Sequence, residues 1–510
     1  MTTLHVDIDR SLDAPIHQQI CDGLRRAILD GRIRPGRRIP STRTLAADLG
    51  VSRFPVLAAY DQLLHEGYLV GRVGSGTYVR GELPDDLFRA PVRSDGGTAN
   101  AAGRSHVASL CTRDEGGLGP FRMSLPALDE FPHRLWARLV ARHAHALPRD
   151  DMAYGDPAGV ASLRVAIAEH LRAARGVRCE AAEVLIVPGS QAALRLAGAV
   201  LLARGDRAAL EEPGYPGARA ALGASGAELV SVPVDEEGLS VPALRSHGDR
   251  VRLAYVTPSH QYPLGIQMTA VRRLALLEWA SRGNAWVLED DYDSEYRYVS
   301  RPLGALQGMD SHGRVIYIGT FSKVLFPAVR VAYLVVPPSL WQRFVDAREA
   351  FDLFSPTLYQ LALADFVQSG QFARHLRRMR RVYQGRRDAL VAGLARHCGD
   401  WLIVHNADAG LHVSALLASG LTDQDVVARI ARRGLTATAL SSCYAGRARR
   451  SGLLLGFGGS AERRLLDATR VLGEVLRTSA LDAGQKQRTV SPESTRGRPR
   501  KAAVAIAKSG

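Results

Sequence analysis

Hydrophobic residues near the start of the chain recur at the spacing of amphipathic helices. In "PIHQQICDGLRRAIL", residues 15–29, four branched side chains fall on one helical stripe, and Gly31 can end the helix. The stripe consists of Ile16, Ile20, Leu24 and Ile28. This pattern predicts a first amphipathic helix over the segment.

Two more helices and a hairpin follow. Ser41 in "PSTRTLAADLG" is a predicted N-cap and Gly50 closes that helix, while Ser52 caps "RFPVLAAYDQLLHEG", which ends at Gly67. The side chains expected to face inward from this third helix are Val56, Ala59, Tyr60 and Leu63. "YLVGRVGSGTYV" then has the pattern of two short β runs around a glycine turn. Residues 1–80 are therefore predicted to form a winged helix-turn-helix, a small α+β domain whose recognition helix can enter a DNA major groove.

From about residue 121 to 477, strand-like apolar runs alternate with helical stretches. The runs are VLIVP, RAALEE, LAYVTP, AWVLEDD, VIYIGT and VAYLVV. Such alternation predicts a large α/β domain with a mainly parallel sheet. Residues 81–120 are rich in Gly, Ala, Pro and charge without periodicity and predict a flexible linker, whereas the polar, basic residues 478–510 predict a disordered tail.

The amino-acid composition bears on the cellular location of the protein and on the class of its binding partner. The 510 residues have a hydrophobic share of 46% and a net charge of +15, carried mostly by arginine. Arginine excess favours a phosphate-rich partner such as double-stranded DNA. No apolar run is long enough to span a membrane, and the five cysteines form no CxxC pair, so we expect a cytoplasmic protein with no membrane partner and no metal site. The cysteines are at positions 21, 111, 179, 398 and 443.

One lysine has a distinctive position in the large domain. Lys323 in "GTFSKVLFPAVR" lies between the apolar runs "RVIYIG" and "VAYLVV", at the lip of a predicted buried sheet. A lone lysine is usually a solvated charge, but pyridoxal 5'-phosphate needs a lysine for a Schiff base with its aldehyde. It also needs a carboxylate at its pyridine nitrogen and an aromatic face. Its phosphate needs hydroxyls, an arginine and a helix N-terminus.

Residues of all these types stand at predicted strand ends. The candidate ring contacts are Asp290, Tyr292 and Tyr215, and the candidate phosphate ligands are Gly189, Ser190, Gln191, Thr320, Ser322 and Arg330. Each has an ordinary alternative, since "EDDYD" also suits a metal-binding or solubilising loop and Tyr215 also suits packing. Their joint order of glycine turn, aromatic, acid, lysine and arginine favours a cofactor site, with Lys323 as the imine-forming lysine.

Residues 15–80 resemble the GntR-type DNA-binding domains, because "PSTRTLAADLGVSR" matches the core of that family and "GSGTYV" its wing. The resemblance implies DNA contacts from two groups of residues. They are Arg43, Ser52 and Arg53 on the helices and Gly74, Ser75, Gly76 and Thr77 on the wing. Phe54 and Pro55 replace small polar residues of relatives; Pro55 fits a first helical turn, and Phe54 can touch a thymine methyl but cannot donate to a base edge. A bundle that mediates only protein contacts is the alternative.

The large domain resembles fold-type I aminotransferases over about 350 residues, including "YGDPAGVASLRVAIAEHL". Within that group, "TPSHQYPLGIQMT", "LEDDYDSEYRY" and "YIGTFSKVLFPAVRVAYLV" resemble the MocR/GabR regulators, which join a GntR-type head to such a domain. The resemblance implies pyridoxal phosphate on Lys323 and the roles given above for its neighbours. It also implies a head-to-tail homodimer, with Tyr154 near the partner's site.

Two departures from working aminotransferases stand out. The asparagine of their "NPTG" motif, which binds the cofactor's phenolate oxygen, is replaced by Tyr262, as is usual in these regulators. Their carboxylate-binding arginine falls in "SGLLLGFGG", where this chain has leucines at 453–455. The arginines that remain as substitutes are Arg219, Arg447, Arg449 and Arg450. His412 is expected to be a buried structural histidine, with a place in the effector pocket as the alternative.

The sequence therefore predicts a regulator in which pyridoxal phosphate, alone or as an external aldimine with an amine or amino acid at Lys323, controls promoter binding. The effector is expected to be a small amine, an amino acid or a B6 vitamer. An active aminotransferase with a vestigial head is the alternative, and a DNA-binding protein that has lost the cofactor is a third reading. The tail segment "RGRPRK", residues 496–501, resembles an AT-hook core and equally suits a plain basic tail.

Overall fold

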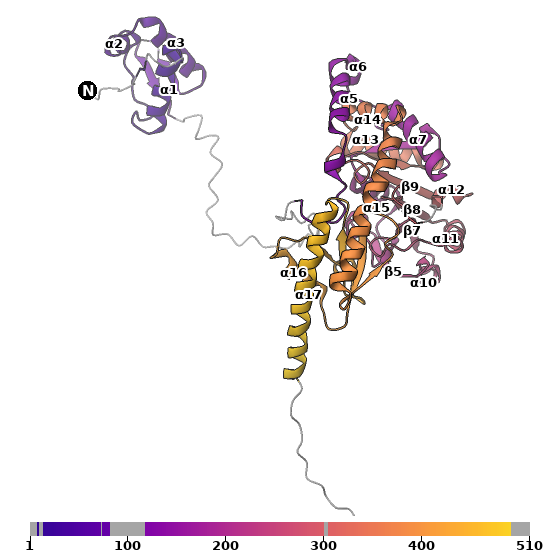
Figure 1. Ribbon diagram of the computed structural model, residues 1–510. Helices are drawn as coiled ribbons and strands as arrows, with labels where there is room; N and C mark the ends of the chain where they lie inside the picture. The colour runs from indigo at the N-terminus through magenta and orange to yellow at the C-terminus, as the bar shows by residue number, and fades with distance from the viewer. Residues whose placement is uncertain (1–7, 10–13, 73, 82–117, 300–303, 491–510) are drawn as a thin grey trace, which may run out of the picture. The chain divides into compact units, whose positions relative to one another are not determined.

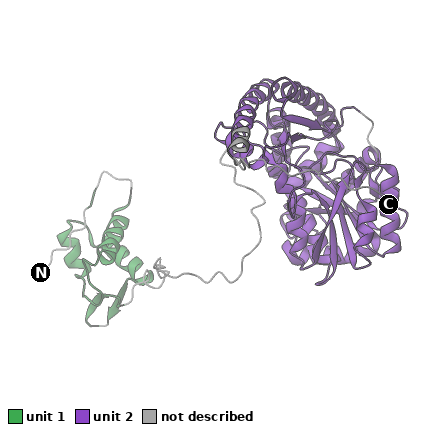
Figure 2. Cartoon of the chain, turned by 90° about the horizontal axis from the view of Figure 1, so that it is seen from below, with its two compact units in different colours: residues 1–104 green, residues 105–510 purple. Residues whose placement is uncertain are grey.

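The computed structural model describes residues 8–9, 14–72, 74–81, 118–299 and 304–490. Contacts divide the chain into two compact units, residues 1–104 and 105–510 (Figure 2). Most of the expected linker, Cys111 and the "RGRPRK" segment lie outside the described residues. Within the described part, no helix has the length and apolar character needed to cross a membrane.

The first unit is a three-helix bundle with a two-stranded wing, as predicted. Its helices are α1 (Ile16–Leu29), α2 (Thr42–Asp48) and α3 (Arg53–His65), and its hairpin pairs β1 (Leu69–Arg72) with β2 (Gly76–Val79). The predicted inward residues are buried together with Ile20, Leu24 and Ile28 of α1. This small core fixes the angle between α2 and α3, because both helices pack their apolar sides into it.

The second unit contains an eight-stranded sheet in the order β3-β10-β9-β8-β7-β4-β5-β6. Its strands are β3 (Val184–Val187), β4 (Arg207–Glu212), β5 (Glu228–Asp235), β6 (Gly238–Leu239), β7 (Val251–Val256), β8 (Trp286–Asp291), β9 (Val315–Thr320) and β10 (Ala332–Val335). All six predicted strands are present, whereas β5 and β6 were not predicted. The sheet is mixed: β10 runs antiparallel to both β9 and β3, and β6 runs antiparallel to β5.

The direction of β10 follows from the length of the segment before it. Residues 321–331 are fewer than the dozen or so that a parallel crossover needs, so β10 returns beside β9 in the opposite direction. Lys323 lies in this segment. Because β10 is antiparallel to β3 and β9, those two strands point the same way, and β8, β7 and β4 share their direction.

Helices cover both faces of this sheet (Figure 1). Residues of β8 alternate between the faces: Leu288 packs with α8, α9 and α13, and Val287 packs with α10 and α11. The helices of this part are α5 (His133–His145), α6 (Arg149–Met152), α7 (Ala161–Arg175), α8 (Ser190–Leu201), α9 (Pro216–Gly223), α10 (Val241–Ser246), α11 (Ala270–Arg282), α12 (Leu306–Met309), α13 (Trp341–Asp352) and α14 (Thr357–Gln368).

The C-terminal part forms a smaller antiparallel sheet, in the order β11-β12-β14-β13, with three helices. The elements are α15 (Gln371–Cys398), β11 (Leu402–His405), β12 (His412–Leu417), α16 (Asp423–Ala431), β13 (Thr438–Ala439), β14 (Gly452–Gly456) and α17 (Glu462–Val490). Helices α15 and α17 run side by side (Figure 1), so closely that a Cβ at Gly393 would meet Thr469. Helix α17 continues past residue 477, where composition had placed the start of a disordered tail, because its apolar stripe packs on α15.

Candidate functional site

The residues singled out by the sequence gather at one edge of the large sheet. Strands β3, β4, β8 and β9 point the same way, and the candidate residues lie at or just beyond their carboxyl ends. Those residues are Gly189 after β3, Tyr215 after β4, Asp290 at the end of β8, and Thr320 and Lys323 at and after the end of β9. Ligands of open α/β sheets bind at this edge, where strand ends and helix starts leave polar groups available.

Asp290 is a buried carboxylate with one oxygen lacking a partner. Tyr255 of β7 donates a hydrogen bond of 2.8 Å to Oδ2, whereas Oδ1 has no hydrogen-bond partner. Burial raises the pKa of Asp290 to about 7, and Lys323 is the nearby cation that opposes this shift. A buried carboxylate oxygen without a donor is costly, so Oδ1 could accept a hydrogen bond from an N–H group of a ligand.

Lys323 is distinguished by the composition of the chain around it. The sequence has lysine only at positions 323, 486, 501 and 508, so Lys323 is the single lysine of residues 1–485. Its Nζ donates a hydrogen bond of 3.1 Å to the carbonyl oxygen of Ser124. All other basic side chains of residues 1–485, apart from histidines, are arginines. A lysine amine can form a Schiff base with a carbonyl group, whereas a guanidinium stays protonated and does not.

The start of α8 and Arg330 lie against each other. Gly189 has a φ of +100°, and a Cβ there would lie 2.7 Å from Arg330 Nη2, so only glycine lets the guanidinium lie over this helix start. Arg330 Nη2 also donates to the carbonyl oxygen of Pro188 at 2.7 Å. Ser190 is the first helical residue, and the N–H groups of this turn carry the positive end of the helix dipole. The arrangement forms an anion cradle.

Two hydroxyls complete the segment that holds Lys323. Thr320 is buried at the end of β9, and its Oγ1 accepts a hydrogen bond of 3.2 Å from the backbone N–H of Ser322. This contact bends the chain immediately after the strand, which brings Ser322 and Lys323 to the sheet edge.

Three tyrosine rings line the site. The rings of Tyr215 and Tyr262 meet edge to face with centroids 5.4 Å apart, and Tyr292 approaches Tyr262 with centroids 6.2 Å apart. Gln191 at the start of α8 donates a hydrogen bond of 3.1 Å to the Tyr215 hydroxyl. Burial raises the pKa of both Tyr262 and Tyr292, so their hydroxyls stay protonated and remain hydrogen-bond donors.

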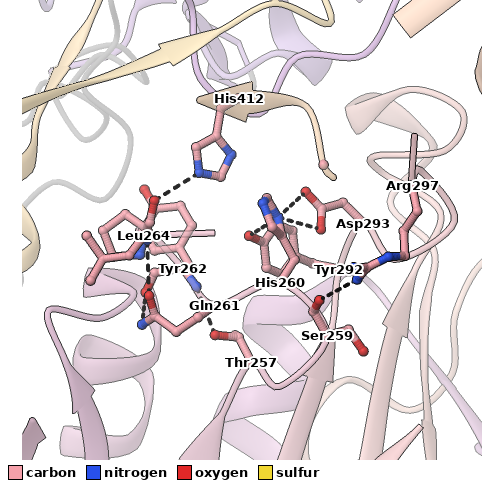
Figure 3. A network of polar contacts seen from close by, with 12 residues as sticks. Thr257, Ser259, His260, Gln261, Tyr262, Leu264, Tyr292, Asp293, Arg297 and His412 are labelled. Carbon is pink, nitrogen blue, oxygen red and sulfur yellow. Dashed lines mark hydrogen bonds and ion pairs between the residues drawn. The ribbon is translucent and has the colours of Figure 1, made fainter. Parts of the chain in front are cut away.

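Behind Tyr292 lies a polar cluster that sequence reasoning missed. His260 Nδ1 lies 3.1 Å from the Tyr292 hydroxyl and 3.1 Å from each carboxylate oxygen of Asp293 (Figure 3). His412 is buried beside it, with its Nε2 3.2 Å from the carbonyl oxygen of Pro263. Burial lowers the pKa of His412 to about 4, so this imidazole is neutral, and it is buried as expected. The sequence signal was available, because His260 stands two residues before Tyr262 in "TPSHQYPLG".

The same three side chains have the composition of a metal site. Ligand atoms of His260, Asp293 and His412 lie within 4.8 Å of one another. His260 and Asp293 are hydrogen-bonded to each other, whereas His412 contacts the His260 ring and lies within hydrogen-bond distance of the Pro263 carbonyl oxygen. We therefore treat the cluster as a hydrogen-bond network.

The arginines considered as carboxylate clamps are engaged or exposed. Arg219 forms an ion pair of 2.8 Å with Glu212. The leucines at 453–455 are buried in β14. Three further arginines are exposed on the loop before β14, namely Arg447, Arg449 and Arg450.

The residues of the head that the sequence predicts to contact DNA are largely exposed. Ser41 is the N-cap of α2 and accepts from the Thr44 N–H, while Ser52 occupies the N-cap position of α3 without a side-chain cap bond. Arg53 Nε donates to Thr42 Oγ1 at 3.1 Å, which ties the starts of α2 and α3 together. Arg43 and Ser52 are exposed, and Phe54 has 78% of its surface exposed.

The wing is shaped by its glycines. Gly74 and Gly76 have φ values of +74° and +107°, which close the hairpin between β1 and β2. A Cβ at Gly76 would lie 2.8 Å from Arg38 Nε, so this arginine lies across the wing. Ser75 is exposed and Thr77 is half-buried, so both residues are accessible to a DNA backbone.

Comparison with known proteins matches both units to families. Residues 16–79 match the family described as bacterial regulatory proteins, gntR family, and residues 130–452 match aminotransferase class I and II. The regulator of Rhizobium meliloti named probable rhizopine catabolism regulatory protein MocR is 41% identical over 463 residues, covering 89% of this chain and 92% of that protein. The chain belongs to the MocR-type family of transcriptional regulators.

Another MocR-type relative supports the family, and a solved enzyme shows the fold of the large unit. The pyridoxine biosynthesis regulator PdxR of Corynebacterium glutamicum is 36% identical, covering 88% of this chain and 93% of that protein. The crystal structure of LysN, an α-aminoadipate aminotransferase of Thermus thermophilus, is 30% identical with a TM-score of 0.67, covering 72% of this chain and 94% of that one. The large unit of this MocR-type protein therefore has the fold of these aminotransferases, joined to a DNA-binding head.

Proposed function

We propose that this regulator holds pyridoxal 5'-phosphate on Lys323, and that the cofactor or an amine joined to it controls binding of the head to a promoter operator. The observation that carries the proposal is Asp290. Its buried Oδ1 has no partner, and Lys323 is the nearby cation that favours its charged form. A protonated pyridine nitrogen would donate to this oxygen, and the only lysine of residues 1–485 would hold the aldehyde.

The residues at the other end of the site suit the phosphate. Gly189, Ser190 and Gln191 start α8, and Arg330 lies over Gly189. Thr320 and Ser322 add hydroxyls on the segment from β9. Charge-assisted bonds from a guanidinium and a helix start are a strong combination for a phosphate group.

Bound there, the cofactor supplies an aldehyde that exchanges one amine for another. Tyr215 would stack on the ring, and the Tyr292 hydroxyl would donate to its phenolate oxygen. Arg219 is held by Glu212, and leucines occupy positions 453–455, which favours an effector amine that needs no carboxylate clamp. Amino acids and B6 vitamers remain within the proposed effector class.

DNA contacts are assigned to the exposed residues of the head. Arg43, Ser52 and Arg53 would meet phosphates or base edges, and the wing residues would meet the backbone. The wing set is Gly74, Ser75, Gly76 and Thr77. An effector can change promoter binding only by binding two arrangements of the protein with different affinity.

A head-to-tail homodimer is part of the proposal. Large apolar side chains are exposed together near the start of the second unit, where Tyr154 has 84% of its surface exposed and packs against Phe354. Met152, Phe351 and Leu353 are exposed in the same two segments. Such a patch marks a protein interface, and a second copy would cover it.

The first experiment is the visible absorption spectrum of purified protein loaded with pyridoxal phosphate, followed by borohydride reduction and peptide mapping. We expect a band that reduction fixes to the peptide containing Lys323, and no such adduct in Lys323→Ala. A stable spectral shift with one amine supports a sensor. Bleaching that a keto acid reverses would show transamination and favour the aminotransferase alternative.

The second experiment measures operator binding by fluorescence anisotropy with wild type and Lys323→Ala, each with and without cofactor and amine. We expect the amine to change wild-type affinity by about 5-fold or more, a common size for coupled binding sites. Lys323→Ala should respond to neither ligand. An equal response in both proteins would place the effector elsewhere.

A further inference from the structure

The polar cluster behind Tyr292 has a defined proton arrangement. Asp293 and His260 are almost fully buried, with side-chain exposures of 2% each, and their contact is a direct one between carboxylate and Nδ1. A buried carboxylate needs a donor, so the imidazole proton lies on Nδ1 and points at Asp293.

The other nitrogen of His260 leads to the same tautomer. His260 Nε2 is buried with no hydrogen-bond partner, and a Cβ added at Gly265 would lie 3.1 Å from it. A proton on Nε2 would be a buried donor without an acceptor. An unprotonated Nε2 without a partner costs less free energy. Both nitrogens therefore favour the Nδ1–H form.

This tautomer decides where the Tyr292 proton goes. Tyr292 Oη is 3.1 Å from His260 Nδ1, but Nδ1 already carries a proton and offers no lone pair. The hydroxyl can therefore only accept from the imidazole, and its own proton faces away from His260. With the pKa of Tyr292 raised by burial, that proton stays in place at neutral pH.

We propose that Asp293 and His260 are positioning residues, which orient the Tyr292 proton toward the phenolate oxygen of the cofactor. This inference rests on the proposed cofactor site at Lys323. Asp293 acts on the tautomer of His260, His260 acts on the direction of the Tyr292 hydroxyl, and neither needs to touch the cofactor. In other protein sites a carboxylate likewise fixes the tautomer and orientation of a histidine through a hydrogen bond.

Other charged groups near the pair are known. The titratable and charged groups that face His260 or its partners are Glu211 of β4, Tyr262 after β7, Asp290 of β8, Tyr292 and Asp293 after β8, Lys323 after β9, His412 of β12, and Arg297. His412 is neutral because its pKa is lowered to about 4, and Arg297 is bound to the Ser259 carbonyl and to Gln267. The pH response of the cofactor band therefore depends on the lysine nitrogen bonded to the cofactor, on the donor from Tyr292 and on Asp290, whose pKa burial raises to about 7.

The test is the pH midpoint of the visible band in cofactor-loaded protein. A donor to the phenolate oxygen stabilises negative charge there and lowers the pKa of the neighbouring lysine nitrogen. Tyr292→Phe should therefore raise the midpoint by about one pH unit, the size expected for a hydrogen bond to a charged group. Asp293→Asn should raise it in the same direction, because an amide accommodates either tautomer of His260.

The double variant separates positioning from a general structural effect. In Tyr292→Phe the hydroxyl is gone, so adding Asp293→Asn should move the midpoint no further. Asp408→Asn is the matched control, since this exposed carboxylate acts on Arg297 but does not contact His260, and it should leave the midpoint unchanged. An unshifted Asp293→Asn, or a shift that persists without the Tyr292 hydroxyl, overturns the inference.

A measurement on the unmutated protein covers the case in which Asp293→Asn does not fold. Nitrogen-15 spectra of histidine-labelled, cofactor-loaded protein report the tautomer, and His260 is assigned by comparison with His260→Gln. We expect the Nδ1–H form, and an Nε2–H form would contradict the inference. Failure of the wild type to show a visible band would overturn the cofactor site and this inference together, whereas a band with the wrong tautomer overturns only the inference.

Discussion

Asp290 shows how burial sets the chemistry of a single side chain. Its place at the end of β8 puts the carboxylate in a pocket where Tyr255 satisfies one oxygen and nothing satisfies the other. Burial therefore raises its pKa to about 7. The folded protein keeps a proton that the unfolded chain loses at lower pH.

This predicts a pH-dependent stability of the cofactor-free protein. Between pH 4 and 7 the unfolded state binds fewer protons at Asp290 than the folded state, so stability falls as the pH rises. A pKa raised from 3.8 to about 7 corresponds to on the order of 4 kcal/mol at most. Cofactor-free Asp290→Asn should melt above the wild type at pH 8 and close to it at pH 5, in a thermal melt monitored by circular dichroism.

The exposed carboxyl of Asp346 provides the control, and Asp346→Asn should follow the wild type at both pH values. Three other carboxyls also have pKa values raised to about 7 by burial, namely Glu211, Glu289 and Glu295, so the wild-type slope will not vanish in Asp290→Asn. Only the difference between the two proteins isolates Asp290. A variant less stable than wild type at pH 8 would contradict the argument.

The start of α8 depends on backbone conformation as well as on its residues. Gly189 combines a φ of +100° with a close approach to Arg330, so a methyl group there meets both strain and a collision. The dipole and N–H groups of the helix start act together with the guanidinium only while it can lie over this turn.

Gly189→Ala is expected to weaken pyridoxal phosphate binding by about 10-fold or more, since a charge-assisted contact is worth roughly 1.5–3 kcal/mol. Spectrophotometric titration measures the affinity. Gly205→Ala is the matched control, because Gly205 has a φ of +93° and no atom within 4 Å of an added Cβ. Gly205→Ala should lower the stability of the fold to a similar extent, because its φ is also positive, but it should leave the affinity for pyridoxal phosphate unchanged. Equal affinities for pyridoxal phosphate in the two variants would contradict the assignment of Arg330 as a phosphate ligand.

The start of α3 carries the corresponding prediction for the head. Arg53 is exposed at the first position of the helix, where a guanidinium can reach a phosphate. Arg53→Ala should weaken operator binding and lower the slope of log affinity against log salt by about one. Arg32→Ala should change the operator affinity and its salt dependence less, because Arg32 pairs with Asp30 outside the recognition helix. Anisotropy titrations at several salt concentrations decide between them.

The two compact units predict separate responses to the cofactor. A ligand stabilises only the folded unit that binds it. Calorimetry of the full chain should show two transitions, of which pyridoxal phosphate raises the one from residues 105–510. Lys323→Ala should lose most of this shift. A cofactor-dependent shift of both transitions would show that the units are energetically coupled in the absence of DNA.

The exposed apolar patch predicts the assembly. Phe351 is 56% exposed beside the Tyr154 segment, so Phe351→Asp should weaken the homodimer at least 10-fold in sedimentation equilibrium. Val271 is 75% exposed on α11, and Val271→Asp should leave the dimer intact. A dimer equally resistant to both changes would place the interface elsewhere.

Much of the architecture was readable from local patterns. The three helices of the head, its wing and all six predicted strands follow from hydrophobic spacing, because one-sided burial imposes the period of each element. Strand β5 was missed because "ELVSVPVD" is only partly buried and contains Pro233, and α17 was cut short because the sequence of its last turns is polar.

The sequence alone was enough to propose Lys323, Asp290 and the turn at Gly189 as parts of one site, since their order along the chain suits the chemistry of one cofactor. It could not show that Asp290 leaves one oxygen unpaired, or that His260 and Asp293 stand behind Tyr292. These features arise from segments distant in sequence: His260 follows β7, Asp293 follows β8 and His412 begins β12. Hydrophobic periodicity specifies which side of an element is buried, whereas hydrogen-bond partners across elements exist only once the strands are placed side by side.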